Sequence, residues 1–307
     1  MAISVVVLTY NSEATLANTL EAALRVSNDI HVVDSFSSDR TPAIAHEYGA
    51  NLVTHSFDNY AAQRNWAIDN LPLKHPWELH LDADECLSEA LTAELAAFTR
   101  QGPPTEINGY CIPRLVHFMG RPIRHGGMFP IWHMRLFRRR LGRCEEREYD
   151  QHFIVEGSTG KLEGPFIDDI RMPLSEWVSR HNRWSDAEVR ELLRESHAVG
   201  LRPALTGNPL ERKRYFRNIY NRMPLFLRAW LLFVYRYVIR LGFLDGREGL
   251  IFFFLQTLWF RFLIDAKLFE QKASRSTVIA ETAVISSVPA NEVEVISRDS
   301  RFPSDES

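Results

Sequence analysis

Residues 3–12, with the sequence ISVVVLTYNS, decide the class of fold. Their apolar, mostly β-branched run continues without a break to Leu8, which is typical of a strand buried on both faces. Polar residues 9–12 then end the strand, and the apolar spacing over residues 16–24 predicts a helix. A buried strand that leads directly into an amphipathic helix is the first unit of an α/β sheet.

The same alternation continues along the chain. Apolar runs at residues 30–33, 51–55 and 77–81 predict three more strands, and residues 59–69 predict a helix before the last of them. Strands that alternate with helices form a parallel sheet whose faces the helices cover. We therefore expect a Rossmann-like α/β domain that binds its ligands beyond the carboxyl ends of the strands.

Three polar clusters follow predicted strands, at residues 9–12, 34–39 and 82–85. In a doubly wound sheet they would meet in one crevice. The first strand is not followed by Gly-x-Gly-x-x-Gly, and Gly-x-x-x-x-Gly-Lys-[Ser/Thr] does not occur. The sequence therefore excludes the usual dinucleotide fingerprint and the phosphate loop of NTPases.

Two carboxylates, Asp82 and Asp84, lie one residue apart at the end of the fourth predicted strand. Both can turn toward one point, because the chain leaves the alternating strand geometry there. Mg²⁺ and Mn²⁺ take oxygen ligands, and they often keep one or two protein carboxylates while substrate phosphates and water fill the other positions. The pair predicts a divalent-metal site, with a solvated turn as the alternative.

Composition excludes several classes of protein. The 307 residues carry a formal net charge of −3, so no overall electrostatic case for nucleic-acid binding exists. The three cysteines, at positions 86, 111 and 144, lie too far apart for a disulfide framework or a Cys-x-x-Cys metal site, which suits a reducing compartment. The chain does not open with a secretory signal, and we expect a cytoplasmic protein.

Four motifs in this order resemble those of the family 2 glycosyltransferases. They are residues 5–12 (VVVLTYNS), 31–41 (HVVDSFSSDRT), 63–67 (QRNWA) and 79–85 (LHLDADE). The resemblance covers residues 3–190, and the similar enzymes build bacterial lipopolysaccharide core or exopolysaccharide. It implies a GT-A type fold for residues 1–205, a nucleotide-sugar donor and inverting sugar transfer.

The resemblance also implies site residues. Thr9 and Asp34 resemble contacts to the base and ribose, although this chain has Asp34-Ser35 where many relatives have Asp-Asp. Asp84 is implied to hold the metal, whereas Asp82 is implied to face the ribose or donor sugar, or to act through water. The residues implied for the donor are Thr9, Tyr10, Asn11, Asp34, Arg64, Asp82 and Arg183, and those for Mg²⁺ or Mn²⁺ are Asp84, Asp82 and His152.

Inverting transfer needs a base that removes the proton of the acceptor hydroxyl. Similar family members carry Glu-Asp followed by Asp-Gln-His, and here Glu146 stands where the Asp of the pair would be. The base is Glu146 or Asp150, and we favour Asp150 because His152 shares its face if the segment is extended. His152 could then bind the metal or orient a phosphate. The alternative is that the acids of residues 145–148 form a solvated turn.

Residues 206–272 are expected to form a helical region that contacts an anionic membrane surface. Residues 212–244 hold eight Lys or Arg and no Asp or Glu, interleaved with aromatic residues, which suits the headgroup layer. The longest uncharged piece, residues 249–260, is too short to span a bilayer. A buried helical hairpin or the interface of a homo-oligomer is the alternative. Residues 273–307 are expected to be a flexible tail.

The leading hypothesis is a metal-dependent glycosyltransferase that moves a sugar from a nucleotide-diphosphate sugar, UDP-sugar above all, to a lipid-linked saccharide at the cytoplasmic face of the inner membrane. A phosphatase of the haloacid dehalogenase type would instead use Asp82 as its nucleophile, but it does not account for the polar clusters at residues 9–12 and 34–39. A non-catalytic membrane adaptor is the third hypothesis, and it leaves Asp82 and Asp84 without a role.

Overall fold

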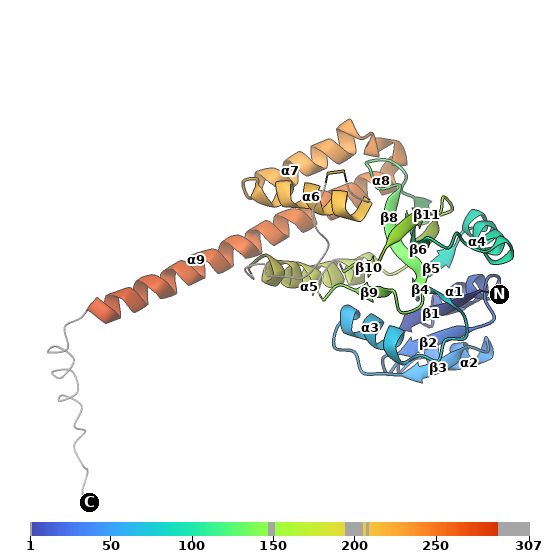
Figure 1. Cartoon of the computed structure of the whole chain (residues 1–307). Coiled ribbons are helices and arrows are strands. Elements are labelled where there is room, and N and C mark those ends of the chain that lie inside the picture. Colours follow the sequence, from blue (N-terminus) through green and yellow to red (C-terminus); the bar gives the residue numbers. More distant parts are fainter. Residues whose placement is uncertain (1, 147–150, 194–204, 207–208, 288–307) are drawn as a thin grey trace, which may run out of the picture.

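The computed structural model describes residues 2–146, 151–193, 205–206 and 209–287. Its N-terminal part alternates strands and helices as the sequence predicts (Figure 1). These elements are β1 (Ile3–Thr9), α1 (Leu16–Leu24), β2 (Ile30–Asp34), α2 (Thr41–Glu47), β3 (Asn51–Thr54), α3 (Tyr60–Asn70) and β4 (Trp77–Asp82). Each predicted strand lies within one residue of its expected bounds.

The four strands β3, β2, β1 and β4 lie side by side in that order and run parallel. Their registers place Thr9 beside Asp34 and Leu8 beside Asp82. Three of the polar strand ends are therefore level with one another at one edge of the sheet. This arrangement confirms the prediction that the polar clusters meet in one place.

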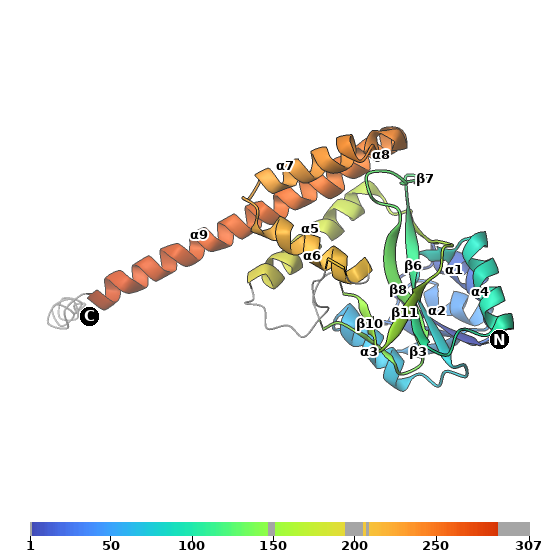
Figure 2. The same cartoon turned by 45° about the horizontal axis from the view of Figure 1, so that its top comes forward.

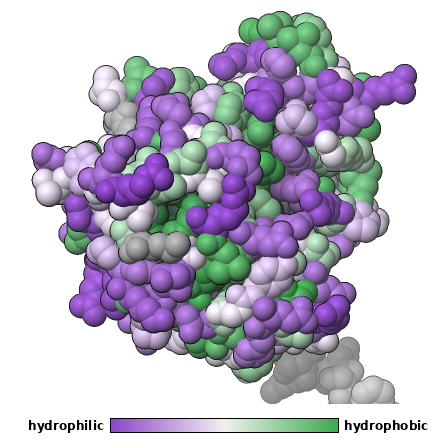
Figure 3. All heavy atoms as spheres, turned by 90° about the vertical axis from the view of Figure 1, so that its right-hand side faces the viewer, coloured by the Kyte–Doolittle hydropathy of each residue, from purple (hydrophilic) through white to green (hydrophobic). Residues whose placement is uncertain are grey.

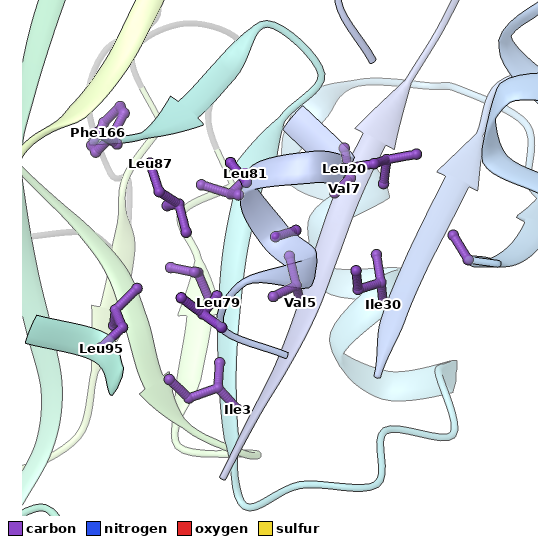
Figure 4. Close-up of a cluster of buried hydrophobic side chains, with 14 of the residues drawn as sticks. Ile3, Val5, Val7, Leu20, Ile30, Leu79, Leu81, Leu87, Leu95 and Phe166 are labelled. Carbon is purple, nitrogen blue, oxygen red and sulfur yellow. The ribbon is translucent and has the colours of Figure 1, made fainter. Parts of the chain in front are cut away.

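Helices cover both faces of this parallel part. Val5 and Val7 of β1 point into a core that Leu20 of α1 shares, whereas the intervening Val6 packs with Ala67 of α3 on the opposite face. Figure 4 shows the first of these cores, in which side chains from β1, β2 and β4 meet those of α1. The continuous apolar run of β1 is thus explained, because both of its faces are buried.

The second half of the sheet is mixed, and the strand directions there were not part of the prediction, which concerned the alternating N-terminal elements. After β4 the chain forms β5 (Glu85–Leu87), α4 (Glu89–Gln101), β6 (Ile107–Phe118), β7 (Arg121–Pro122), β8 (Ile131–Arg138), β9 (Gly142–Cys144), β10 (Phe153–Val155), β11 (Ser158–Lys161) and β12 (Phe166–Ile170). Strand β8 is antiparallel to both β4 and β6, because no helix crosses over between β6 and β8 and the chain simply turns back.

Helices form the C-terminal part of the chain. They are α5 (Leu174–Leu193), α6 (Pro209–Arg222), α7 (Leu227–Val234), η1 (Tyr235–Ile239), η2 (Gly242–Asp245), α8 (Gly246–Phe253), η3 (Phe254–Trp259) and α9 (Phe260–Ser287). Figures 1 and 2 both show α9 extending beyond the rest of the molecule. Residues 273–287, which the sequence assigned to a tail, continue this helix because Pro289 is the first helix breaker after Gly249. Residues 288–307 lie outside the described part.

The C-terminal helices pack against the sheet domain. Phe252 and Phe253 of α8 join Val116 and Phe118 of β6 in one apolar core, and Val189 of α5 packs with residues of α9 in another. The first core explains a glycine in the loop after β7. Gly126 has a φ of +64°, and a Cβ atom there would lie 2.1 Å from the ring of Phe253. The helical region is therefore an integral wall of the domain.

Internal ion pairs use part of the basic cluster that the sequence assigned to a membrane. Arg228 is buried and donates from Nε to Asp265 at 2.8 Å, and Arg217 and Arg261 both bind Glu188. The acids that pair with these arginines lie outside residues 212–244, so the local sequence could not reveal them. One helix, Gly242–Ser274, is long and apolar enough to cross a membrane, and 44% of its most apolar window is buried within the protein.

Candidate active site

The first two polar strand ends form one hydrogen-bonded unit. The hydroxyl of Thr9 donates to Asp34 Oδ1 at 2.9 Å, and both side chains are buried. Asp34 also accepts from the backbone N–H of Ser37 at 2.8 Å. Asn11, at a φ of 47°, ties the two loops together, since its backbone N–H donates to Ser37 Oγ. Tyr10 stands out from this unit with 64% of its surface exposed.

Asp82 is held by two arginines from different elements. Its carboxylate accepts from Arg64 of α3 at 2.9 and 3.2 Å and from Arg135 of β8 at 3.1 Å. Although burial opposes them, these guanidinium groups hold the pKa of Asp82 well below its usual range. Both oxygens of Asp82 are engaged, which disfavours a direct metal contact and also the nucleophilic role that a phosphatase would require.

Glu85 completes this ion-pair cluster. Arg135 donates to Glu85 Oε1 at 2.6 Å, and Glu85 Oε2 accepts from the backbone N–H of Asp82 at 2.9 Å. Burial raises the pKa of Glu85 to about 8, and the neighbouring carboxylates add to that rise against the charge of Arg135. Arg135 was not predicted from the sequence, because it lies on β8, a strand distant in the chain that pairs with β4.

Asp84 differs from Asp82 in its surroundings. It lies in the turn between β4 and β5, and no ion pair to it is formed within the described part of the chain. Burial raises the pKa of Asp84 to about 7, and the negative charges of Asp168 and Asp82 add to the rise, while Arg180 opposes it. The negative charges near Asp84 thus outweigh the positive charge of Arg180.

A cavity of about 310 Å³ opens beside Asp84. The strands β6, β8 and β12 form one side of it, and α5 with the C-terminal helices forms the other. Its charged lining residues are Asp84, Asp168, Arg114, Arg180, Arg236 and Arg261. Thr9, Tyr10 and Asp34 are not among the residues that line it, whereas Asp84, two residues after the strand end that is level with theirs, lines it.

Arg183, which the resemblance implies for the donor, lies on α5. That residue is exposed and does not line the cavity, whereas Arg180, one helical turn earlier on α5, does. Arg180 lies over the ring of Trp184 at 4.6 Å. His181 also lines the cavity and is buried, and its Nδ1 lies 2.9 Å from the carbonyl oxygen of Trp177. Burial lowers the pKa of His181 to about 4, so it is neutral at pH 7.

The predicted base and third metal ligand lie in the segment after β9. Glu146 is exposed, and Asp150 lies outside the described residues. His152 is buried, with its backbone N–H donating to Glu145 Oε2 at 3.2 Å. Across residues 2–146, 151–193, 205–206 and 209–287, no three His, Cys, Asp or Glu side chains form a group that could hold a metal ion. The expected set of Asp82, Asp84 and His152 is therefore not a preformed metal cluster.

The chemistry of Asp84 nevertheless fits a divalent cation. A carboxylate is a hard oxygen ligand, and the pKa of Asp84 is raised first by burial and then by Asp168 and Asp82, whose negative charge a cation would neutralise. Mg²⁺ in particular is often held by one or two carboxylates and by the phosphates of the substrate, so a three-ligand protein cluster is not required. Asp84 and the nearby Asp168 are the residues that would hold such an ion.

Comparison with known proteins decides the family. Residues 4–148 match the family described as "Glycosyl transferase family 2". The chain contains a family 2 glycosyltransferase domain. The match includes the strand ends, Arg64, Asp82 and Asp84, and the mixed α/β sheet is of the GT-A-like kind that the sequence analysis expected.

Individual relatives of this family 2 domain are distant. A lipopolysaccharide core biosynthesis glycosyltransferase, LpsC of Rhizobium meliloti (strain 1021), is 24% identical over 260 residues, which cover 82% of this chain and 89% of LpsC. An uncharacterized glycosyltransferase of Rickettsia felis (strain ATCC VR-1525 / URRWXCal2) is 34% identical over 93 residues, or 30% of this chain and 32% of that protein. Both relatives are named glycosyltransferases, and both similarities to this chain are distant.

Two solved structures are also similar. Residues 1–349 of S. aureus TarS, in complex with UDP, align with a TM-score of 0.44 and 14% identity over 89% of this chain and 92% of that chain. Glucosyl-3-phosphoglycerate synthase from Mycobacterium tuberculosis, in complex with Mn²⁺ and UDP-glucose, aligns with a TM-score of 0.38 and 14% identity over 57% of this chain and 73% of that chain.

Proposed function

We propose that this chain is a metal-dependent, inverting glycosyltransferase that moves a sugar from a UDP-sugar to a lipid-linked saccharide in surface-polysaccharide assembly. Similarity to LpsC over most of both chains supports lipopolysaccharide core as the product. The observation that carries the proposal is the position of Asp84, a carboxylate in the cavity lining that forms no ion pair with any described residue and follows directly on the strand end of β4.

The first strand ends supply the donor site of this proposal. Asp34, fixed by Thr9 and by the N–H of Ser37, is assigned to the nucleoside in this proposal. The exposed ring of Tyr10 and the loop around Asn11 border the same edge of the sheet. Arg64 and Asp82 lie next to this edge, where their ion pair joins α3 to the end of β4.

Leaving-group stabilisation and proton removal complete the reaction. A divalent cation, Mg²⁺ or Mn²⁺, would neutralise negative charge on the departing diphosphate when it is bound at Asp84. Asp150 or Glu146 removes the proton of the acceptor hydroxyl, and E146Q and D150N variants distinguish the two by which of them loses transfer.

Contact with the inner membrane, on its cytoplasmic face, is part of the proposal. Apolar side chains from α7 to η3 are exposed, and Figure 3 shows hydrophobic residues at the top of the molecule, where Figure 1 places α7 and α8. The exposed residues include Trp230, Leu231, Val234, Val238, Ile239, Leu241, Phe243, Leu244 and Phe254. A W230D/I239D variant should bind anionic vesicles at least tenfold more weakly, whereas a change in its oligomeric state alone would favour a homo-oligomer interface.

Hydrolysis of nucleotide sugars tests the catalytic part. The full-length protein is incubated with a panel of UDP-sugars and GDP-sugars and Mn²⁺, and released nucleotide is measured. D84N should lower the rate by about 100-fold or more. D58N is the matched control, because Asp58 is an exposed aspartate outside the site. Equal rates for D84N and D58N would contradict the role of Asp84.

A further inference from the structure

Two of the four arginines in the cavity have no acidic partner among the described residues. Arg114 lies 3.6 Å from Asp168, and Arg261 binds Glu188 at 2.9 Å. In contrast, Arg180 and Arg236 form no ion pair with a carboxylate in the part of the chain that the structure describes. Arg180 contacts a methionine sulfur and the ring of a tryptophan, and its charge acts on Asp84 from a distance. Arg236 Nη1 approaches another methionine sulfur.

Arg236 is the more unusual of the two. It lies in η1 and reaches the cavity from the helical wall, opposite the strands that carry Asp168. Burial, together with the positive charges of Arg261 and Arg240, lowers its pKa to about 10. Arg236 is half-buried, and proteins normally pair a guanidinium that is partly withdrawn from water with a negative charge. The arrangement is therefore that of a site whose anion comes from outside the chain.

The position of Arg236 indicates which substrate brings the anion. The nucleoside end of the proposed donor site, at Thr9 and Asp34, does not line the cavity. The wall that holds Arg236 instead belongs to the helices whose outer surface is apolar and exposed. A lipid-linked acceptor would approach along those helices. The cavity that these helices border is then the space into which the saccharide of such an acceptor would reach.

We propose that the acceptor carries a phosphate group, and that Arg236 and Arg180 bind this phosphate in the cavity beside Asp84. The inference rests on the proposed function and names the chemical class of its acceptor. Arginine suits this role, since it is always charged and its planar fork can present two N–H donors to phosphate oxygens. The phosphate so bound would fix the acceptor while the reacting hydroxyl lies near Asp84.

Titration with a hexose phosphate tests the site directly. Glucose 6-phosphate is titrated calorimetrically into full-length protein that is saturated with UDP and Mn²⁺, and unphosphorylated glucose is the reference. We expect the phosphate ester to bind the wild type, and glucose to bind at least tenfold more weakly. R236Q should weaken binding of the phosphate ester by about tenfold. R247Q is the matched control, because Arg247 is exposed on α8 and does not line the cavity.

Several results would overturn the inference. One is equal affinity of R236Q and R247Q for glucose 6-phosphate. Another is binding that UDP abolishes, which would mean that the phosphate occupies the donor site. A loss in R236Q of affinity for anionic vesicles alone would assign Arg236 to lipid headgroups. Should R236Q not fold, R180Q tests the same site, with the same outcomes expected.

The design separates this inference from the proposed function. Binding of UDP with Mn²⁺ is measured first, and its absence in the wild type would contradict the donor site. If UDP binds and the phosphate ester does not, only the assignment of the acceptor fails. An R236K variant tests whether the two parallel N–H donors of the guanidinium matter, since lysine keeps the positive charge but lacks these donors. Its affinity for glucose 6-phosphate should lie between those of the wild type and R236Q.

Discussion

Asp82 and Asp84 should respond to the same substitution with opposite changes in stability. In D82N the carboxylate that accepts three hydrogen bonds from Arg64 and Arg135 loses its charge and one of its acceptor oxygens. Breaking a buried ion pair from one side costs about 3–5 kcal/mol. The side chain of Asp82 is 31% exposed, and solvent screens its ion pairs. We therefore expect D82N to lower the free energy of unfolding by less than a fully buried pair would, by about 2–3 kcal/mol.

In D84N, by contrast, the substitution removes a buried negative charge that Asp168 and Asp82 repel. A rise in the pKa of Asp84 from 3.8 to about 7 corresponds to an upper limit of about 4 kcal/mol of unfavourable interaction with the charged form. Partial access to solvent reduces this to about 1–2 kcal/mol. At pH 8 in the presence of a chelator, D84N should therefore be more stable than the wild type, which is the pattern expected where a protein gives up stability for function.

Thermal unfolding at pH 8 with EDTA measures both effects. A change of 1 kcal/mol shifts the Tm by about 2–4 °C for a protein of 150–250 residues, and by somewhat less for a longer chain. D82N should melt below the wild type and D84N above it, with D58N unchanged. The reasoning would be refuted if D84N melted as far below the wild type as D82N, because Asp84 would then make stabilising contacts within the protein.

Two further predictions concern the helices that form the cavity wall. Because His181 is neutral and buried, with a pKa of about 4 against an unfolded value near 6.5, the unfolded state binds an extra proton between these values. Stability is full above pH 6.5 and falls by about 2–3 kcal/mol as the pH drops toward 4, and H181Q should flatten that slope in melting curves recorded from pH 4 to 8. R228M should lower stability by about 3–5 kcal/mol, since it leaves Asp265 charged and buried, whereas the double variant R228M/D265N should lose less. Equal losses in the single and double variants would show that packing, and not the unpaired charge, sets the effect.

The sequence predicted the parallel half of the sheet well, for a physical reason. The strands there are buried on both faces, so their apolar runs are continuous and their polar ends mark the edge of the sheet. The same logic placed Asp82 and Asp84 beside Thr9 and Asp34. Strand β8 could not be placed so simply, because pairing between distant segments decides its direction and register. Arg135, which β8 brings to Asp82, was missed for that reason.

The sequence contains a signal for Arg180 in the spacing of residues along α5. Trp177, His181 and Trp184 are spaced four and three residues apart and form one stripe of α5, and all three line the cavity. Arg180 lies three residues after Trp177 and four before Trp184, so helical geometry places it on that stripe. Arg183 does not share this spacing. A motif resemblance had favoured Arg183, whereas the periodicity of the helix favoured its neighbour one turn earlier.

The partners of Asp168 and of the arginines in the C-terminal helices could not be predicted from a single sequence. Asp168 meets Asp84 because β12 lies beside β5 in the sheet, more than eighty residues later in the chain. Arg228 and Asp265 likewise come from different helices. Such partners depend on tertiary packing, and local composition therefore overstated the free positive charge of residues 212–244.

Binding of UDP in the presence and absence of Mn²⁺ tests the central claim most directly. Calorimetric titration of UDP into the full-length protein should show an affinity that rises at least tenfold when Mn²⁺ is added. In D84N that gain should disappear, while D58N keeps it. An affinity for UDP that is the same with Mn²⁺ and with EDTA, or a full Mn²⁺ effect in D84N, would contradict the assignment of Asp84 as the residue that joins a metal ion to the donor.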